Sequence, residues 1–263
     1  MKVLQLTFQR KQTQWVKENF APFLLQHSKI PAVTPIKGDT VAVLLHPRVA
    51  SIEQLPTQLQ DSLQEQEIQV EMQQETRLNR LEEENLWVVQ FFSKSKACVA
   101  LEIGLPDTWK QVLSNFYRSD VVIEKRRYAT VEHYFQSQKA LCSSRPEMFD
   151  WFHTDSSSPN HIPADPLLAK QAGARKSYTT HGAVLDFNLW LEKRVAVMEN
   201  AIQERYIQDK LFQQVLQSTK GLLLWHFERS GAKSFWGGSI NPKTLERKGK
   251  NQLGQILMNC RDS

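Results

Sequence analysis

The stretch YATVEHYFQSQKAL, residues 128–141, predicts a single helix with two different faces. Thr130 is a favourable N-cap for this helix. At about 100° per residue, Glu132, Gln136 and Lys139 fall on one narrow polar stripe. A second stripe carries bulky and apolar side chains, namely Val131, Tyr134, Phe135 and Cys142. We expect the polar stripe to face a pocket and the second stripe to anchor the helix in the core.

The length and composition of the chain bound its class. With 263 residues, of which 41% are hydrophobic and 10% aromatic, the chain has room for one sizeable domain plus an appendage, or for two small domains. No run approaches the about 18 uncharged apolar residues of a membrane span, and the N-terminus MKVLQLTFQRKQTQW carries charges where a secretory signal is apolar. We therefore expect a globular cytosolic protein with no membrane partner.

Cysteine usage argues against a disulfide framework and against a metal site. Cys98, Cys142 and Cys260 are odd in number and widely separated, without a CxxC pair or nearby paired histidines. They are interpreted as reduced thiols.

The charge balance is a weak indicator of partners. A net charge of +5 with a pI near 9.0 is compatible with nucleic acid, with phosphorylated metabolites or with no particular partner. The basic clusters at 124–127 and 246–250 are more typical of solvated turns, and neither has the alternating aromatics of a single-strand binding surface. A nucleic-acid partner is therefore not expected.

Residues 1–92 differ from the rest of the chain and are predicted to form an accessory region of mixed character. Short strands are expected at 3–8 and 41–46, with a connection broken by Pro31, Pro35 and Gly38. Residues 58–85 are rich in Gln and Glu and predict a helical stretch. A capping or partner-binding role is favoured over an active one for this region.

Residues 93–263 are predicted to form the main domain. Two strands are expected near its start, at 87–93 and 98–103, separated by a turn at 94–96, and either strand could belong to either side of the boundary. A further strand is expected at 121–123 and a polar loop at 154–166. Helices dominate the C-terminal part of the domain and are expected at 167–176, 186–206, 210–218 and 251–260, whereas 222–227 is either a strand or a helix end.

A second concentration of chemically useful residues lies at 234–261. Trp236 and Gly237 join a flat aromatic surface to a backbone that can expose its N–H groups, and Lys250 and Asn251 lead into a helix N-terminus. A flat ring and a phosphate would both fit there. Taken singly, these features are weak, because Trp-Gly-Gly occurs in ordinary turns and a lone tryptophan is more often core filling.

The polar residues of the first helix also have ordinary explanations. A carboxylate in the first turn, such as Glu132, complements the helix dipole by a few tenths to about 1 kcal/mol. His133 is more often a satisfied, partly exposed histidine, and Lys139 more often a solvated lysine. For each of these residues taken alone, a structural role is favoured over a catalytic one.

Five segments in the same order together resemble the NADAR superfamily, also called YbiA-like. The segments are LSNFY (113–117), YATVEHYFQSQKA (128–140), AKQAGARKS (169–177), WLEKRVAVMENAIQERY (190–206) and FWGG…GKNQLGQILMNCR (235–261). The resemblance covers roughly 150 residues, a normal size for one domain. It does not reach residues 1–92.

This resemblance implies a mixed α+β, mainly helical fold and an N-glycosidase activity. Characterised YbiA-like members hydrolyse the bond between ribose 5-phosphate and the aminopyrimidine in the first two intermediates of riboflavin biosynthesis, which disposes of reactive compounds. By position, the functional residues of the family correspond to Ser114, Asn115, Phe116, Glu132, Trp190, Trp236 and Gly237.

Two positions depart from the family pattern. Lys233 stands where the family usually has an aspartate, three residues before the Trp-Gly pair. The usual Gly-Arg pair is here Gly173-Ala174-Arg175, with the arginine displaced by one. Each departure puts one family contact with the ligand in doubt.

The chemistry of N-glycoside hydrolysis suggests a role for each residue. A carboxylate such as Glu132 could stabilise an oxocarbenium-like transition state or deprotonate the attacking water. The leaving base needs a proton or a donor, and His133, Gln136 and Lys139 are alternatives for this task. The rings of Trp190 and Trp236 would cover the base, while Lys250, the N–H groups at Asn251 or the 114–115 loop would take the phosphate. The scheme needs no metal and no cofactor.

Two other functions remain open at this stage. An enzyme that processes ADP-ribose would need room for a diphosphate, and the basic excess with Arg175 and Lys233 could favour it. A non-catalytic nucleotide sensor would use residues 1–92 as its output surface. The N-glycosidase ranks first, since an intact Glu132 and Trp236-Gly237 favour catalysis.

Overall fold

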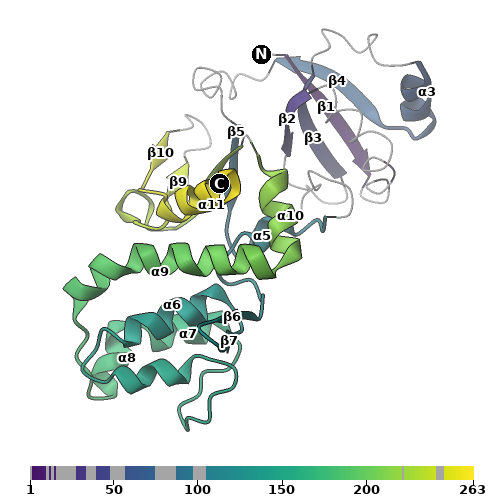
Figure 1. Cartoon of the computed structure of the whole chain (residues 1–263). Coiled ribbons are helices and arrows are strands. Elements are labelled where there is room, and N and C mark those ends of the chain that lie inside the picture. Colours follow the sequence, from purple (N-terminus) through teal and green to yellow (C-terminus); the bar gives the residue numbers. More distant parts are fainter. Residues whose placement is uncertain are drawn as a thin grey trace. The chain divides into compact units, whose positions relative to one another are not determined.

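The computed structural model divides the chain into two compact units (Figure 1). One unit consists of Met1–Val112 and Gln214–Gly254, and the other of Leu113–Gln213 and Gln255–Ser263. The structure describes residues 2–9, 12, 15, 28–33, 40–47, 57–74, 87–96, 105–220, 222–240 and 246–263.

The first unit contains a four-stranded antiparallel sheet. Its strands are β1 (Lys2–Gln9), β2 (Ser28–Val33), β3 (Thr40–Pro47) and β4 (Gln69–Gln74), in the spatial order β2-β3-β1-β4. The strands predicted at 3–8 and 41–46 are confirmed. Pro31 was expected in a break but lies within β2, which is a correction. Because β2 is an edge strand with a register shift between Ser28 and Pro31, a proline is tolerated there.

The helix predicted over residues 58–85 is much shorter than expected. α3 (Thr57–Glu65) ends early because Glu67 adopts a left-handed φ of 53°, and β4 begins at Gln69. The sequence QVEMQQ alternates apolar and polar residues, which is the period of a strand, so the helical prediction was wrong there. Residues 75–85 lie outside the described part of the chain.

Two strands that are distant in sequence pair in the same unit. β5 (Trp87–Phe91) runs parallel to β8 (Leu222–His226), with Trp87 opposite Leu222. This confirms the strand predicted at 87–93 and resolves 222–227 as a strand. The predicted turn is present, since Ser95 Oγ accepts from Phe92 N at 2.8 Å. The strand predicted at 98–103 lies outside the described residues, as does Cys98.

Four further elements that the structure describes in the first unit are short. They are α5 (Trp109–Val112), η4 (Gly231–Lys233), β9 (Ser239–Ile240) and β10 (Arg247–Lys248). β9 and β10 pair antiparallel, with Ile240 opposite Arg247.

The second unit is mainly helical and is built around α6 (Val131–Ala140). A hairpin of β6 (Val121–Ile123) and β7 (Arg126–Tyr128) precedes it, and both hairpin residues Glu124 and Lys125 have positive φ. α6 packs against η3 (Pro146–Trp151), α7 (Pro166–Ala172) and α9 (Phe187–Gln208). Figure 1 shows α9 as the long green helix beside α6.

Most predicted helices are confirmed, with one division. Residues 167–176 form two helices, α7 and α8 (Arg175–Thr180), because α7 is capped at Gly173 and the chain turns at Ala174. α9 begins after the N-cap Asp186, α10 spans Lys210–Ser218, and α11 spans Gln252–Asp262. The mixed α+β, mainly helical class predicted for the chain is confirmed.

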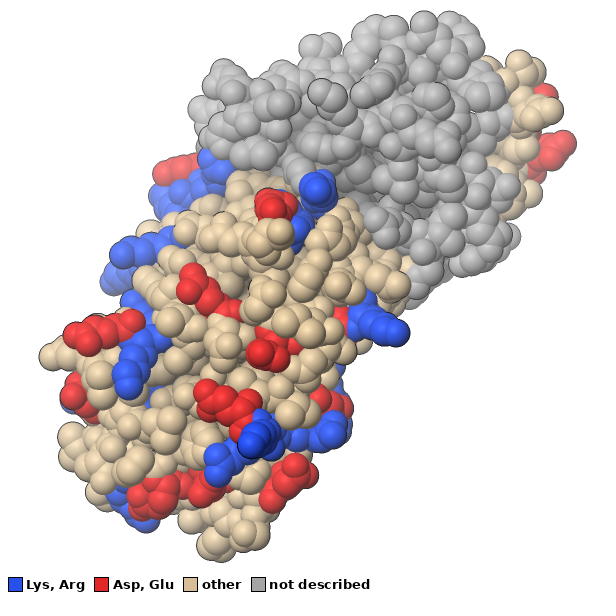
Figure 2. Space-filling model, in the orientation of Figure 1, with Lys and Arg blue, Asp and Glu red and all other residues tan. Residues whose placement is uncertain are grey.

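The described surface mixes charges of both signs. On the face seen in Figure 2, lysine and arginine side chains alternate with aspartates and glutamates over the part of the chain that the structure describes. Within those same residues, no helix is both long and apolar enough to cross a bilayer.

Candidate active site

Glu132 is a buried carboxylate in the first turn of α6. Only 7% of the residue is exposed, so it is not a solvated residue that merely complements the helix dipole. Its backbone N–H donates to Asn115 O at 3.1 Å, which ties the 113–117 loop to the start of the helix. The predicted N-cap is confirmed, since Thr130 has extended backbone angles and its hydroxyl accepts from His133 N.

Gln136 holds the carboxylate from one turn further along α6. Its Nε2 donates to Glu132 Oε1 at 2.8 Å, and both side chains are buried. A donor on a carboxylate oxygen stabilises the ionised form. The Oε1 atom of Gln136 is buried without a hydrogen-bond partner.

Lys139 completes the polar stripe. Its Nζ donates to Gly173 O at 2.6 Å and lies 5.9 Å from the centre of the Tyr178 ring. Burial lowers the pKa of Lys139, whereas the charge of Glu132 acts in the opposite direction. The stripe predicted from helical periodicity is therefore partly buried and its members are electrostatically linked. That it faces a substrate stays a prediction.

His133 is occupied by protein partners on both ring nitrogens. Nε2 donates to Pro163 O at 2.9 Å, which leaves Nδ1 to accept from the Thr130 hydroxyl at 2.8 Å. Burial lowers the pKa of His133, with Pro163 O and Asp165 opposing this shift. The imidazole is thus a neutral link between the start of α6 and the loop before α7.

The 114–116 loop lies beside the start of α6. Ser114 Oγ accepts from Phe116 N at 3.2 Å, and Lys170 Nζ lies 5.8 Å from the centre of the Phe116 ring. Asn115 donates through Nδ2 to Met198 Sδ at 3.3 Å, while its Oδ1 is buried without a partner. The structure therefore brings the loop next to Glu132, as the position of Asn115 O already shows.

Arg205 supports this loop and was missed by the sequence analysis. Its Nη1 donates to Ser114 O at 3.1 Å, its Nε lies 3.2 Å from Asp209 Oδ2, and the guanidinium stacks 4.1 Å from the centre of the Phe212 ring. The side chain is fully buried, and this burial lowers the pKa of Arg205 to about 10 against the opposing charge of Asp209. The only sequence signal was the i, i+4 spacing of Arg205 and Asp209 on a helix.

Two further predicted residues of this unit take different positions. Trp190 is buried and packs edge-on against Phe135, with ring centres 4.8 Å apart. The second stripe of α6 therefore does anchor the helix, as expected. Arg175 is exposed at the first position of α8.

The other predicted residues lie in the first unit. Gly237 N donates to Ser234 Oγ at 2.9 Å, and the Ser234 hydroxyl in turn donates to a carboxylate oxygen of Glu228. Trp236 is half-buried, and its ring lies edge-on to Phe235 at 5.1 Å. Backbone and hydroxyl groups of this turn are thus paired with one another.

The N-terminus of α11 does not offer the free N–H groups that the sequence suggested, which is a correction. The N–H groups of Asn251, Gln252 and Leu253 donate to carbonyls of residues 235–237 at 3.0–3.1 Å. The Asn251 side chain accepts from His226 N and donates to Leu224 O, so it fastens the helix start to β8. Lys250 is exposed, with Nζ 5.7 Å from the centre of the Phe235 ring.

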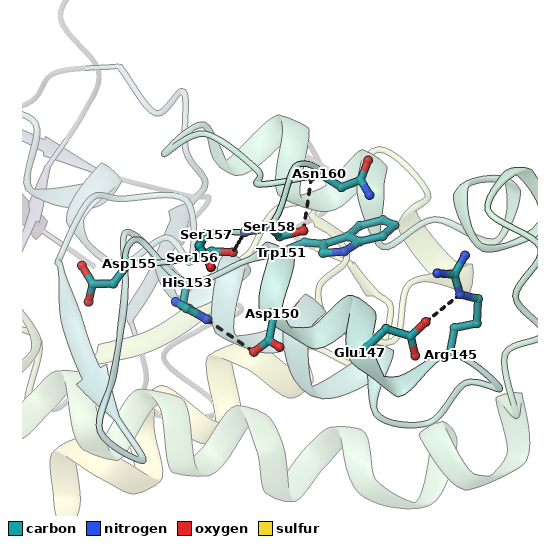
Figure 3. Close-up of a pocket in the computed structure, with 10 residues that line it drawn as sticks. All are labelled: Arg145, Glu147, Asp150, Trp151, His153, Asp155, Ser156, Ser157, Ser158 and Asn160. Carbon is teal, nitrogen blue, oxygen red and sulfur yellow. Dashed lines mark hydrogen bonds and ion pairs between the residues drawn. The ribbon is translucent and has the colours of Figure 1, made fainter.

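A pocket of about 450 Å³ lies elsewhere in the second unit, around η3 and the following loop (Figure 3). Its lining residues are Arg145, Glu147, Asp150, Trp151, His153, Asp155, Ser156, Ser157, Ser158 and Asn160. None of the residues predicted for the site is among them.

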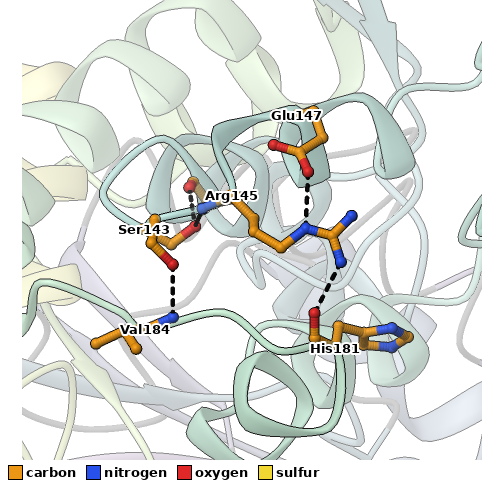
Figure 4. A network of polar contacts seen from close by, with 7 residues as sticks. Ser143, Arg145, Glu147, His181 and Val184 are labelled. Atoms are coloured by element: carbon orange, nitrogen blue, oxygen red, sulfur yellow. Dashed lines mark hydrogen bonds and ion pairs between the residues drawn. The ribbon is translucent and has the colours of Figure 1, made fainter.

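Charged groups at this pocket pair with one another. Arg145 Nε lies 2.7 Å from Glu147 Oε1, and its Nη1 donates to His181 O at 2.7 Å (Figure 4). Asp150 lies 3.5 Å from His153 Nε2 and 3.3 Å from Arg126 Nη2. These partners account for most of the charge in the lining.

Neither a metal cluster nor a disulfide is found within the described ranges. No group of three His, Cys, Asp or Glu side chains there could hold a metal ion. Cys142 and Cys260 are free thiols, and burial raises the pKa of both, that of Cys260 to about 11.

Fold and site together define a class of protein. A mixed α+β domain that buries an amide-held carboxylate at the start of a helix, beside a tightly fixed loop, is suited to acid–base chemistry on a small molecule. The family is given by comparison with known sequences. The model of the NADAR domain matches residues 105–263, so the chain belongs to the NADAR family, as the motifs predicted.

Two sequence relatives of known name agree with this assignment. An N-glycosidase of Nostoc punctiforme is 28% identical over 149 residues, which cover 57% of this chain and 82% of that protein. The N-glycosidase YbiA of Shigella boydii is 26% identical over 149 residues, which cover 57% of this chain and 78% of that protein. Among solved structures, the NMR structure of the E. coli protein YbiA matches with a TM-score of 0.46 and 23% identity, over 67% of this chain and 83% of that chain.

Proposed function

We propose that this chain is an N-glycosidase that separates ribose 5-phosphate from the aminopyrimidine of the first two riboflavin-biosynthesis intermediates. Family membership and the names of the relatives support an N-glycosidase activity. The observation that carries the proposal is the burial of Glu132 with an amide donor on its carboxylate. The proposal includes a cytosolic location and a role in the disposal of reactive metabolites.

Glu132 is the catalytic carboxylate in this proposal. Cleavage of a C1′–N bond develops positive charge on the ribose, and a nearby carboxylate stabilises that charge or takes a proton from the attacking water. Gln136 keeps the carboxylate ionised and fixes the direction of Oε1. The hydrolysis adds water across the bond, giving ribose 5-phosphate and the free amine of the pyrimidine.

Lys139 is the best placed of the three groups that could assist the leaving base. Gln136 is bound to Glu132 through its Nε2, and His133 is bound through both ring nitrogens. Lys139 uses one of its three N–H groups on Gly173 O, which leaves two for a substrate. Its lowered pKa also makes proton donation easier than from an exposed lysine.

Substrate contacts by the remaining predicted site residues stay predictions. They are Ser114, Asn115, Phe116, Arg175, Trp190, Trp236, Gly237 and Lys250.

The test is a direct product assay with the purified full chain. Freshly prepared ribosylamino-pyrimidine 5-phosphate and, separately, ADP-ribose are incubated with the protein, and released ribose 5-phosphate and free base are quantified. Release from the pyrimidine compound alone is expected. Release from ADP-ribose alone would replace the proposed substrate, and tight binding without any release would indicate a sensor.

A matched pair of variants excludes a contaminating hydrolase. Glu132→Gln is expected to abolish the release, whereas Glu147→Gln, which alters an exposed carboxylate, is expected to keep it. Equal activity of both variants would remove Glu132 from the mechanism.

A further inference from the structure

The amide of Gln136 occupies the space where Gly173 would carry a side chain. A Cβ atom at Gly173 would lie 1.8 Å from Gln136 Oε1, 2.4 Å from its Cδ and 3.0 Å from its Cγ. These distances are far below van der Waals contact, so no residue larger than glycine fits while Gln136 keeps its place.

The backbone conformation of Gly173 does not itself require glycine. Its φ of −82° and ψ of 3° are open to any residue. The close approach of the Gln136 amide is therefore the reason for a glycine at this position.

Gly173 cannot move away from the amide without breaking other bonds. Its N–H donates to Ala169 O at 3.0 Å, where it caps α7. Its carbonyl accepts from Lys139 Nζ at 2.6 Å, which ties it to α6. The backbone at Gly173 is therefore held in place on one side of the Gln136 amide.

The other side of the amide meets the candidate catalytic group. Gln136 Nε2 donates to Glu132 Oε1 at 2.8 Å, while Oε1 lies buried and unpaired against Gly173. A buried amide oxygen without a protein partner costs free energy, whereas the hydrogen bond from Nε2 to a charged acceptor stabilises this placement of the amide.

We propose that Gly173 is a positioning residue that acts through Gln136, holding its amide on the carboxylate of Glu132. The structural part of this inference stands on the contacts alone, whereas its effect on hydrolysis rests on the proposed function. Any side chain at position 173 displaces the amide, removes the donor from Glu132 and leaves the carboxylate less oriented and more easily protonated.

Gly173→Ala suits the test because it should spare the fold. All three close contacts come from the end of one flexible side chain, which can turn aside. At Gly237, Gly238, Gly249 and Gly254 an added Cβ would instead lie within 2.4 Å of a backbone oxygen. Gly182→Asn is the matched control, since a Cβ there meets nothing within 4 Å and asparagine tolerates its φ of 67°.

The first measurement needs no substrate. In protein labelled with ¹⁵N-glutamine, the side-chain signal of Gln136 is assigned by its loss in Gln136→Ala and followed as the pH is lowered. In the wild type we expect this signal to shift as Glu132 takes up a proton. In Gly173→Ala we expect the shift to vanish, and in Gly182→Asn to remain. A Gln136 signal that titrates alike in wild type and Gly173→Ala would overturn the inference.

The second measurement is a double-mutant cycle on hydrolysis. Gly173→Ala is expected to lower kcat about tenfold, which is the effect of losing one hydrogen bond to a charged group, and to change KM little. The acid limb of the pH profile of kcat is expected to move to higher pH, because a carboxylate without this donor is protonated more easily. In the Gln136→Ala background the same substitution should have no further effect. If Gly173 served packing alone, Gly173→Ala would lower the melting temperature in both the wild-type and the Gln136→Ala background. The acid limb of the pH profile would then stay where it is.

The two measurements separate the two proposals. An inactive wild type with the expected titration of the Gln136 signal would refute the proposed function and keep the positioning role. An active wild type with unchanged titration and kinetics in Gly173→Ala would refute the positioning role alone.

Discussion

The carboxyl group of Glu132 is buried, and burying an ionised carboxylate costs free energy. An ionised carboxylate tolerates burial only when donors compensate for the lost water, and Gln136 Nε2 supplies one at 2.8 Å. Such an arrangement is more typical of a functional group than of a residue that only stabilises a helix.

The first prediction concerns Glu132 itself. Glu132→Gln should keep the melting temperature within a few degrees, since shape and burial are retained, and should lower kcat by roughly 10²- to 10⁴-fold. Steady-state kinetics with the pyrimidine substrate and a thermal melt check both parts. A variant that retains more than a tenth of the wild-type kcat would contradict the assignment.

The second prediction concerns pH and His133. Burial lowers the pKa of this residue below its usual value of about 6.5, so on acidification the unfolded state takes up the proton before the folded state does. The free energy of unfolding should therefore fall as the pH drops below about 6.5, and less steeply in His133→Gln. Urea unfolding at several pH values measures this slope.

A second variant concerns His161, an exposed imidazole whose charge also lowers the pKa of His133. His161→Gln should therefore make the slope less steep than in the wild type, but by less than His133→Gln, because burial is the larger cause of the lowered pKa. A His133→Gln slope equal to that of the wild type would show that other groups determine the acid sensitivity.

For single residues, helical periodicity predicted the polar stripe of α6, and the residue type of Thr130 predicted its N-cap. Spacing along one helix is enough to bring Glu132 and Gln136 together. It could not predict Arg205 as a support of the loop, because Ser114 O comes from a distant part of the sequence. Nor could it predict that carbonyls of a preceding turn would use the N–H groups at Asn251.

Among the elements, α9 does most to hold the candidate site. It contributes Arg205 to the carbonyl of Ser114, and Met198 to the side chain of Asn115. The 114–116 loop therefore depends on a helix that starts about seventy residues further along the chain.

The third prediction tests this dependence. Arg205→Met should lower the free energy of unfolding by roughly 3 kcal/mol, since it leaves Asp209 and Ser114 O without their buried partner. Arg118→Met, which removes an exposed arginine paired with Asp120, should cause no measurable loss. Chemical denaturation of the two variants gives the comparison, and similar stabilities would refute the structural role of Arg205.

Helices were predicted best where apolar residues recur at helical spacing along the whole element. α6, α9 and α10 were expected within a few residues of their observed bounds. Prediction failed where a local backbone feature overrides the period, such as the left-handed Glu67 that ends α3 and the cap at Gly173, followed by the extended Ala174, that separates α7 from α8.

For the molecule as a whole, the sequence placed the boundary of the main domain at residue 93. The family model matches from residue 105, whereas β5 (Trp87–Phe91) pairs with β8, which lies within the matched range. We therefore propose that an independently stable fragment must include β5.

The fourth prediction compares two fragments. A fragment that begins at residue 87 should melt roughly 5 °C or more above one that begins at residue 93, because the shorter one leaves β8 without its neighbour. Val89→Pro in the longer fragment is the matched control, since it interrupts the pairing opposite Leu224 without shortening the chain. Equal melting temperatures for the two fragments and the Val89→Pro variant would contradict this prediction and place the start of the main domain at residue 93.

The pairing of β5 with β8 also bears on how the protein is made. About half of the chain separates Trp87 from its partner Leu222, so β5 emerges from the ribosome long before β8 exists. Contacts over such sequence distances form late and slowly. During synthesis the strand WVVQF therefore lacks its β8 partner until most of the chain has been made, and over that interval its unpaired edge is exposed to aggregation.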